Sequence, residues 1–189
     1  MYIKVIIIIS FSILYGLFEI LMSRRGKGNR EISKSEDRGS IWIMILAISA
    51  GYWLSFIIAS TKTGRIYHWN TLFTIGSILA AIGLIIRVTS ILKLKEHFTY
   101  TVTKIENHQL VDTGLYSCIR HPGYLGQLII FLGIATALSN WISIFSMIIP
   151  VLVGYINRIR VEEKFLTQQM GQKYIDYQKR TKKLIPYIF

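Results

Sequence analysis

The sequence is poor in the residues that build disulfide-stapled or metal-clustered folds. It has one cysteine, Cys118, among 189 residues, which excludes an internal disulfide and a cysteine-rich metal site. We assign no metal ligands. Acidic residues are also scarce, because 10 Asp and Glu stand against 22 Lys and Arg, giving a formal net charge of +12. Such an excess indicates an anionic partner, either nucleic acid or the surface of a membrane.

Long hydrophobic runs are abundant. Hydrophobic residues make up 52% of the sequence, and the mean hydropathy is +0.43. A helix needs about 20 apolar residues to cross the hydrocarbon core of a bilayer, and several windows reach that length. The runs predict an all-α integral membrane protein with five transmembrane helices in a single domain, 1-189. The expected spans are 2-22, 41-59, 71-92, 123-138 and 141-157.

Two of these spans needed a choice between alternatives. The first run lacks a small-residue cleavage site and is long, so we expect a retained span rather than a signal peptide. The last run, 124-156, is too long for one span, and the polar pair Ser139-Asn140 divides it. We therefore expect two helices joined by a tight turn at that pair.

Basic residues predict the orientation in the membrane. They are concentrated in the loop 23-40, in the segment after the third span and in the C-terminal tail, whereas the Ser139-Asn140 turn carries none. The positive-inside rule then places the N-terminus outside and the C-terminus in the cytoplasm. We expect a multi-pass protein of the prokaryotic inner membrane, with membrane lipids rather than nucleic acid as the anionic partner.

Two charged residues, Glu19 and Arg87, fall within expected spans. A charge inside a bilayer is costly, so each requires a partner, a functional role or access to the headgroups. We favour a structural ion pair or snorkelling over a reactive site.

The residues with chemical potential lie in the C-terminal two-fifths of the chain. Arg120-His121-Pro122-Gly123-Tyr124 stands where a polar segment meets an apolar run. Pro122 suits the first turn of a helix, and the unpaired N–H groups of that turn attract anions. The motif therefore indicates an anion site, with lipid phosphate bound by Arg120 as the alternative.

Arg158 and Glu162 stand at the other end of this apolar run. They are four residues apart and share one face of a helix. Taken alone, they are an ordinary ion pair at a membrane exit, and Arg160 and Glu163 beside them fit a solvated helix end.

The motifs in combination resemble the isoprenylcysteine carboxyl methyltransferase family of integral membrane enzymes. The likeness runs from about His108 to Pro186 and comprises R-H-P-x-Y, the Glu162-Glu163 pair and G-x-x-Y-x-x-Y at 171-177. Phospholipid methyltransferases share much of this pattern, so the resemblance specifies the methyl donor better than the acceptor.

The resemblance implies that S-adenosylmethionine binds in a cytoplasmic region formed by about 96-122 and 158-189. Arg158 matches the arginine assigned to the substrate carboxylate. The positions that match the family's cofactor-binding residues are His108, Gln109, Leu110, Val111, Tyr116, Arg120, His121, Pro122, Gly123 and Glu162.

The chemistry of the donor agrees with these roles. Arg120, His121 and a helix N-terminus suit the carboxylate of S-adenosylmethionine, whereas Glu162 suits its ammonium or a ribose hydroxyl. A C-terminal carboxylate has a pKa of about 3.3–3.7, so the acceptor is already ionised and needs no general base. Catalysis then reduces to alignment, in which the planar fork of Arg158 holds the acceptor.

The leading hypothesis is an S-adenosylmethionine-dependent methyltransferase acting on a lipid-like acceptor at the cytoplasmic face, by default the carboxylate of an isoprenylcysteine. The alternative acceptor is a phospholipid amine, which must first lose a proton. A nicotinamide-dependent membrane reductase and a transporter are two further classes. The order of Arg158 and Glu162, and the gathering of polar residues in one C-terminal block, argue against both.

Overall fold

A computed structural model describes residues 2–25, 39–94 and 110–185. The regular elements within these ranges are helices. They are α1 (Tyr2–Arg25), α3 (Ser40–Ser60), α4 (Trp69–Leu94), the 3-10 helix η2 (Gly114–Ser117), α5 (Pro122–Ala137), α6 (Trp141–Met170) and α7 (Gln172–Arg180).

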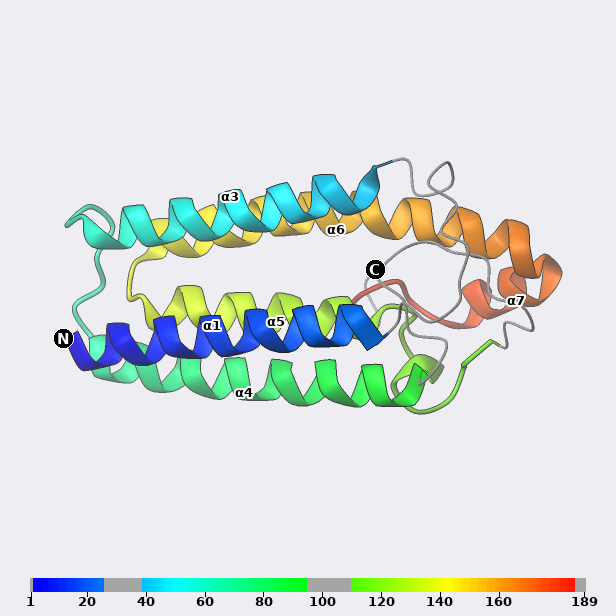
Figure 1. Cartoon of the computed structure of the whole chain (residues 1–189), viewed down its shortest axis with the longest axis horizontal. Helices are drawn as coiled ribbons and strands as arrows, with labels where there is room; N and C mark the ends of the chain where they lie inside the picture. Colours follow the sequence, from blue (N-terminus) through cyan, green and yellow to red (C-terminus); the bar gives the residue numbers. More distant parts are fainter. Residues whose placement is uncertain (1, 26–38, 95–109, 186–189) are drawn as a thin grey trace.

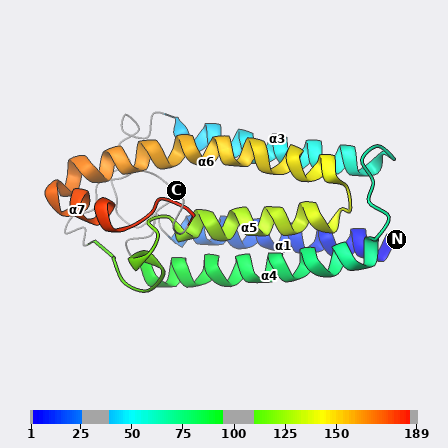
Figure 2. The ribbon, with the colours of Figure 1, turned by 180° about the vertical axis from the view of Figure 1, so that it is seen from behind.

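The long helices lie alongside one another in an elongated bundle, and α7 lies at the end away from the N-terminus (Figure 1). The closest pairings are α4 with α5 and α3 with α6, and α5 and α6 link the two pairs. Figure 2 shows the same pairings from behind. The motif at the start of α5 and the last turns of α6 consequently face each other at the α7 end of the bundle.

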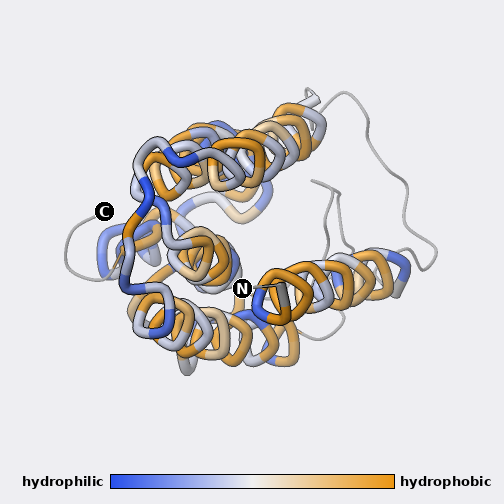
Figure 3. The backbone as a smooth tube through the Cα atoms, turned by 90° about the vertical axis from the view of Figure 1, so that its left-hand side faces the viewer, coloured by the Kyte–Doolittle hydropathy of each residue, from blue (hydrophilic) through white to orange (hydrophobic). Residues whose placement is uncertain are grey.

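Hydrophobicity accounts for the bundle. Ile3–Arg24, Ser40–Ser60, Trp69–Leu94 and Trp141–Met170 are long and apolar enough to cross a membrane. Figure 3 shows the helices largely in hydrophobic colours, with hydrophilic residues gathered at the connections and ends. The protein is thus a helical, multi-pass membrane protein.

The expected count of five spans is supported only in part. The apolar helix α5 occupies the place of the expected span 123-138, but it has 16 residues, fewer than the roughly 20 that cross a bilayer unaided. The helix α6 has 30 residues and continues past 157, carrying Arg158 and Glu162 on its polar continuation.

Small residues bring α4 and α5 into backbone contact. A Cβ atom added to Gly83 of α4 would lie 2.6 Å from the carbonyl oxygen of Gly126 in α5. Close approach through small residues is the usual means by which apolar helices pack in lipid, where no hydrophobic effect drives them together. This packing fixes the start of α5 against α4.

Hydrogen bonds fix the opposite end of the bundle. Ser55 of α3 and Ser143 of α6 exchange hydroxyl-to-carbonyl bonds of 3.0 and 2.9 Å. The side chain of Asn140 caps α6 by accepting from the backbone N–H groups of Ile142 and Ser143. Its amide donates to the carbonyl of Thr63 at 2.7 Å. This bond connects the turn between α5 and α6 to the turn between α3 and α4.

Glu19 and Arg87 form an ion pair, which decides between the structural pair and the snorkelling that the sequence left open. Arg87 donates to both carboxylate oxygens of Glu19, Nε at 2.9 Å and Nη2 at 2.8 Å, and the Tyr15 hydroxyl donates to the same carboxylate at 2.6 Å. A Cβ atom on Gly123 would lie 2.8 Å from Nη1 of Arg87. The pair therefore joins α1 to α4 directly beside the motif at the start of α5.

Candidate functional site

The C-terminal tail folds back against the motif segment. Arg120 N donates to the carbonyl of Lys182 at 2.8 Å, and His121 N donates to that of Lys183 at 3.0 Å. Lys182 N in turn donates to the carbonyl of Cys118 at 3.0 Å. Leu184 follows with 1% exposure and joins the core of the bundle. The tail therefore forms one wall of the region expected to bind the cofactor.

The G-x-x-Y-x-x-Y motif makes this return possible. Gly171 has φ +57°, a conformation that side chains disfavour, and it separates α6 from α7. The helix α7 then buries Tyr174 and Tyr177, and the Tyr177 hydroxyl donates to the carbonyl of Tyr116 at 2.7 Å. Burial raises the pKa of the Tyr116 phenol further above its ordinary value, at which the group is already a neutral hydroxyl near neutral pH.

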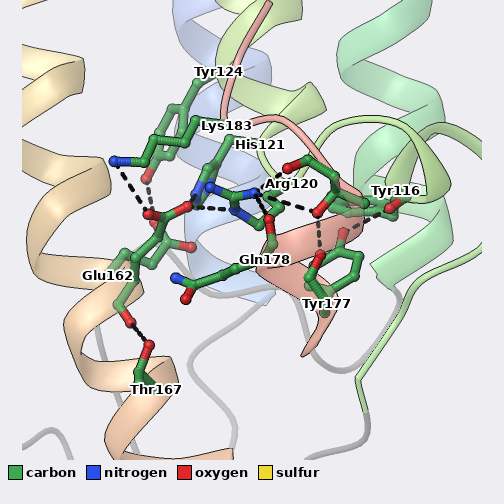
Figure 4. A network of polar contacts seen from close by, with 11 residues as sticks. Tyr116, Arg120, His121, Tyr124, Glu162, Thr167, Tyr177, Gln178 and Lys183 are labelled. Carbon is green, nitrogen blue, oxygen red and sulfur yellow. Dashed lines mark hydrogen bonds and ion pairs between the residues drawn. The ribbon is translucent and has the colours of Figure 1, made fainter. Parts of the chain in front are cut away.

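Glu163 lies at the centre of a buried cluster of charges. Its Oε1 accepts from Arg120 Nε at 2.6 Å and lies 3.2 Å from His121 Nε2, while its Oε2 lies 3.6 Å from Lys183 Nζ. Figure 4 shows Arg120, His121 and Lys183 directed toward this part of α6. The interpretation of Glu163 as part of a solvated helix end is wrong, because the residue is only 6% exposed. The motif pattern singles out its neighbour Glu162 instead, since only that position matches a known family role.

Arg120 also holds the tail through backbone carbonyls. Its Nη1 donates to the carbonyl of Thr181, and to that of Gln178 at 3.2 Å. The guanidinium thus joins α6 to the end of α7. The predicted role of Arg120 toward a cofactor carboxylate stays a prediction beside this structural one.

Tyr124 brings Glu162 and Arg158 together. Its hydroxyl donates to Glu162 Oε2 at 3.0 Å (Figure 4). The same hydroxyl accepts from Arg158 Nε at 3.4 Å. Arg158 Nη1 donates to the Ser40 hydroxyl at 2.7 Å. The sequence had placed Tyr124 only within a motif and had not singled out Ser40, since no pattern marks the first residue of α3 as a neighbour of α6.

The remaining expected residues lie at the start of α5, in or before η2, or outside the described residues. Pro122 opens α5 at its first turn, with Gly123 next to it. Leu110 and Val111 are half-buried and precede η2, which carries Tyr116. His108 and Gln109 fall outside the described residues. Within the described ranges, no group of three or more His, Cys, Asp or Glu side chains suits a metal ion.

Comparison with known proteins identifies the family. Residues 71–173 match the family model of phospholipid methyltransferases. The chain is 31% identical to protein-S-isoprenylcysteine O-methyltransferase B of Arabidopsis thaliana, over 76% of this chain and 77% of that relative. The chain belongs to the isoprenylcysteine carboxyl methyltransferase family. It is also 31% identical to the protein-S-isoprenylcysteine O-methyltransferase of Tribolium castaneum, over 76% of this chain and 51% of the relative.

The fold agrees with this family. A solved structure of a eukaryotic intramembrane Ras methyltransferase, an isoprenylcysteine carboxyl methyltransferase, superposes with a TM-score of 0.60 and 27% identity. The similarity covers 78% of this chain and 52% of that one, so the chain spans about half the length of some of the relatives it matches. The family model begins at residue 71 and includes all but the first two residues of α4, a helix in which the sequence showed no motif.

Proposed function

We propose that this membrane methyltransferase transfers a methyl group from S-adenosylmethionine to the carboxylate of an isoprenylcysteine or a similar lipid-like acid. The observation that carries the proposal is the placement of Arg158 and Glu162 on one face of α6, both joined to the Tyr124 hydroxyl. An acceptor-binding cation and a cofactor-binding carboxylate are thereby held a few ångströms apart where the apolar helices end.

The described residues suit the donor. Glu162 offers a carboxylate to an ammonium or a ribose hydroxyl, and the buried Tyr116 offers an aromatic face to a sulfonium or an adenine. The N-terminus of α5, with Arg120 and His121 before it, suits an anionic group. S-adenosylmethionine, when bound, supplies an electrophilic methyl group on its sulfonium. His108, Gln109, Leu110, Val111, Pro122 and Gly123 complete the proposed set by family resemblance.

Arg158 suits the acceptor. The residue is 2% exposed, and Ser40 and Tyr124 hold its side chain, so the guanidinium has a defined orientation. A planar guanidinium binds a carboxylate in a bidentate manner and orients its oxygens. Because the acceptor carboxylate is ionised near neutral pH, alignment and exclusion of water are the main contributions that the protein must make.

The distribution of charge gives the proposed orientation. The site end of the described structure carries exposed basic residues on α7 and the tail, including Lys179, Arg180 and Lys182. Such residues favour the cytoplasmic side. We therefore propose that the N-terminus lies outside and that the site faces the cytoplasm. A prokaryotic inner membrane is the location that we propose beside this orientation.

A phospholipid amine is the second candidate acceptor, and the description of the matched family model favours it. The relatives named as isoprenylcysteine O-methyltransferases favour the carboxylate. An amine must lose a proton before it attacks the methyl group, whereas a carboxylate need not. The two acceptors therefore make different demands on the same site.

The test is methyl transfer by the protein purified in detergent. Radiolabelled S-adenosylmethionine is supplied with N-acetyl-S-farnesylcysteine or with phosphatidylethanolamine in mixed micelles. We expect label to enter the farnesylcysteine, and we expect Glu162→Ala to weaken binding of S-adenosylhomocysteine at least about tenfold, as loss of a charged hydrogen bond implies. Labelling of phosphatidylethanolamine alone would transfer the proposal to the second acceptor. Absence of S-adenosylhomocysteine binding would refute a methyltransferase site.

A further inference from the structure

Among the residues that the structure describes, two clusters that each combine a tyrosine, a glutamate and an arginine can be compared. In the cluster formed by Tyr15, Glu19 and Arg87, the arginine donates directly to the carboxylate at 2.8 and 2.9 Å. In the cluster on α5 and α6, the Tyr124 hydroxyl stands between the two charged groups. The first cluster is an ion pair within the bundle. The second cluster links Glu162, which we propose binds the cofactor, to Arg158, which we propose binds the acceptor.

Tyr124 is itself held in place. Its ring centroid lies 5.1 Å from that of Tyr155 and 5.8 Å from that of His121. The ring therefore has little freedom to turn, and the direction of its hydroxyl bonds is set by the helices. A displacement of the Arg158 side chain would act on the hydroxyl rather than on the ring.

We propose that Tyr124 is a positioning residue that couples the cofactor carboxylate Glu162 to the acceptor cation Arg158. The proposal rests on the methyltransferase function proposed above. A hydroxyl that accepts a bond from a cation is polarised and becomes a stronger donor to its own acceptor. A change in the Arg158–Tyr124 hydrogen bond therefore changes the strength of the Tyr124–Glu162 hydrogen bond. A reorientation of Glu162 acts on Arg158 through the same hydroxyl.

The coupling links the two substrates. By thermodynamic reciprocity, a ligand that orders Glu162 favours the ligand of Arg158 by the same factor, and the reverse also holds. Ser40 anchors the other end of the guanidinium at 2.7 Å, so α3 takes part in the coupling from the N-terminal half of the chain. The enzyme then holds its acceptor in line most firmly when the donor is present.

The experiment is a double-mutant cycle read by binding of S-adenosylhomocysteine, and it needs no acceptor. Wild type, Tyr124→Phe, Arg158→Gln and the double variant are purified in detergent and titrated by calorimetry. The through-space effect of the lost charge occurs in both backgrounds and cancels. We expect the factor by which Arg158→Gln changes the dissociation constant to differ at least about threefold between the wild-type and Tyr124→Phe backgrounds. Equal factors in the two backgrounds would overturn the coupling.

Tyr15→Phe is the matched control, because it also removes a tyrosine hydroxyl that donates to a glutamate paired with an arginine. We expect its effect on the dissociation constant to multiply independently with that of Arg158→Gln. Non-additivity of the same size with Tyr15→Phe would assign the effect to general loosening and overturn the coupling.

A second variant covers the case in which Tyr124→Phe does not fold. Ser40→Ala removes one anchor of Arg158 without touching the Tyr124–Glu162 bond. We expect it to weaken S-adenosylhomocysteine binding at least about twofold, and an unchanged dissociation constant would overturn the coupling. Wild type that binds no S-adenosylhomocysteine would refute the proposed function and the coupling together. Wild-type binding with independent effects of the variants would refute the coupling alone.

Discussion

Arg120 Nε donates to Glu163 Oε1 at 2.6 Å across the junction between the start of α5 and the polar end of α6. Both side chains are buried. The same guanidinium reaches the carbonyls of Gln178 and Thr181, so one ion pair holds three segments of the chain together. The proposed cofactor region is therefore complete only when the C-terminal tail is packed against α5 and α6.

Glu163→Gln should undock this junction. Loss of the carboxylate leaves Arg120 buried without its anionic partner, which costs about 3–5 kcal/mol when a buried pair is broken from one side. We expect a lower unfolding temperature in detergent and faster proteolysis of the tail. Asp176→Asn is the control, since Asp176 pairs with Lys179 on the exposed face of α7 and its loss should leave both measurements unchanged. An unaltered unfolding temperature for Glu163→Gln would contradict the structural role.

Glu19→Gln and Arg87→Gln should each destabilise the protein, because each removes one charge of a largely buried ion pair. The double variant should be more stable than the sum of the two losses predicts, by about 0.5–3 kcal/mol. Thermal unfolding in detergent measures all three. Strict additivity would show that the two residues do not stabilise each other.

Gly83→Ala should disrupt the packing of α4 on α5. The added methyl group would lie 2.6 Å from the Gly126 carbonyl, and backbone cannot move aside as a side chain can. Overpacking of this kind costs about 1–3 kcal/mol. Gly16→Ala is the matched control on α1, where a Cβ atom meets nothing within 4 Å. Comparable unfolding temperatures for the two variants would show that α4 and α5 are not in backbone contact.

The dependence of the rate on pH should reveal the acceptor. A carboxylate acceptor with a pKa of about 3.3–3.7 is fully ionised at neutral pH, so its supply of the reactive form does not change between about pH 6 and 8. An amine acceptor is protonated at the lower pH and becomes reactive as the pH rises. We expect kcat/KM for N-acetyl-S-farnesylcysteine to be flat across this interval. A tenfold rise per pH unit would indicate that a proton must leave before methyl transfer.

Some of the site could be predicted from the sequence because its residues are local. Arg120, His121 and Pro122 are adjacent, and Arg158 and Glu162 are one helical turn apart, so their shared placement follows from helix geometry alone. Ser40 and Tyr124 could not be assigned in this way. Ser40 lies 118 residues from Arg158 in the chain. No sequence pattern around a serine predicts a hydrogen bond to so distant a residue.

The contacts of Glu163 could not be predicted either, although this residue lies within the Glu162-Glu163 motif. Adjacent residues on a helix point in different directions, and the sequence cannot say which neighbour of Glu162 faces protein and which faces solvent. The answer depends on the return of the tail through Gly171, which brings Lys183 and the carbonyl of Thr181 to the same junction.

The sequence by itself determined that this is a helical membrane protein with a methyltransferase motif, because hydrophobic length and local spacing are properties of short segments. Tertiary structure decided which groups the charged side chains contact. It paired Arg87 with Glu19 and Arg120 with Glu163, and it gave Arg158 hydrogen bonds to Ser40 and Tyr124. The reason is physical, since a buried charge requires a partner but the identity of that partner is set only when distant segments pack together.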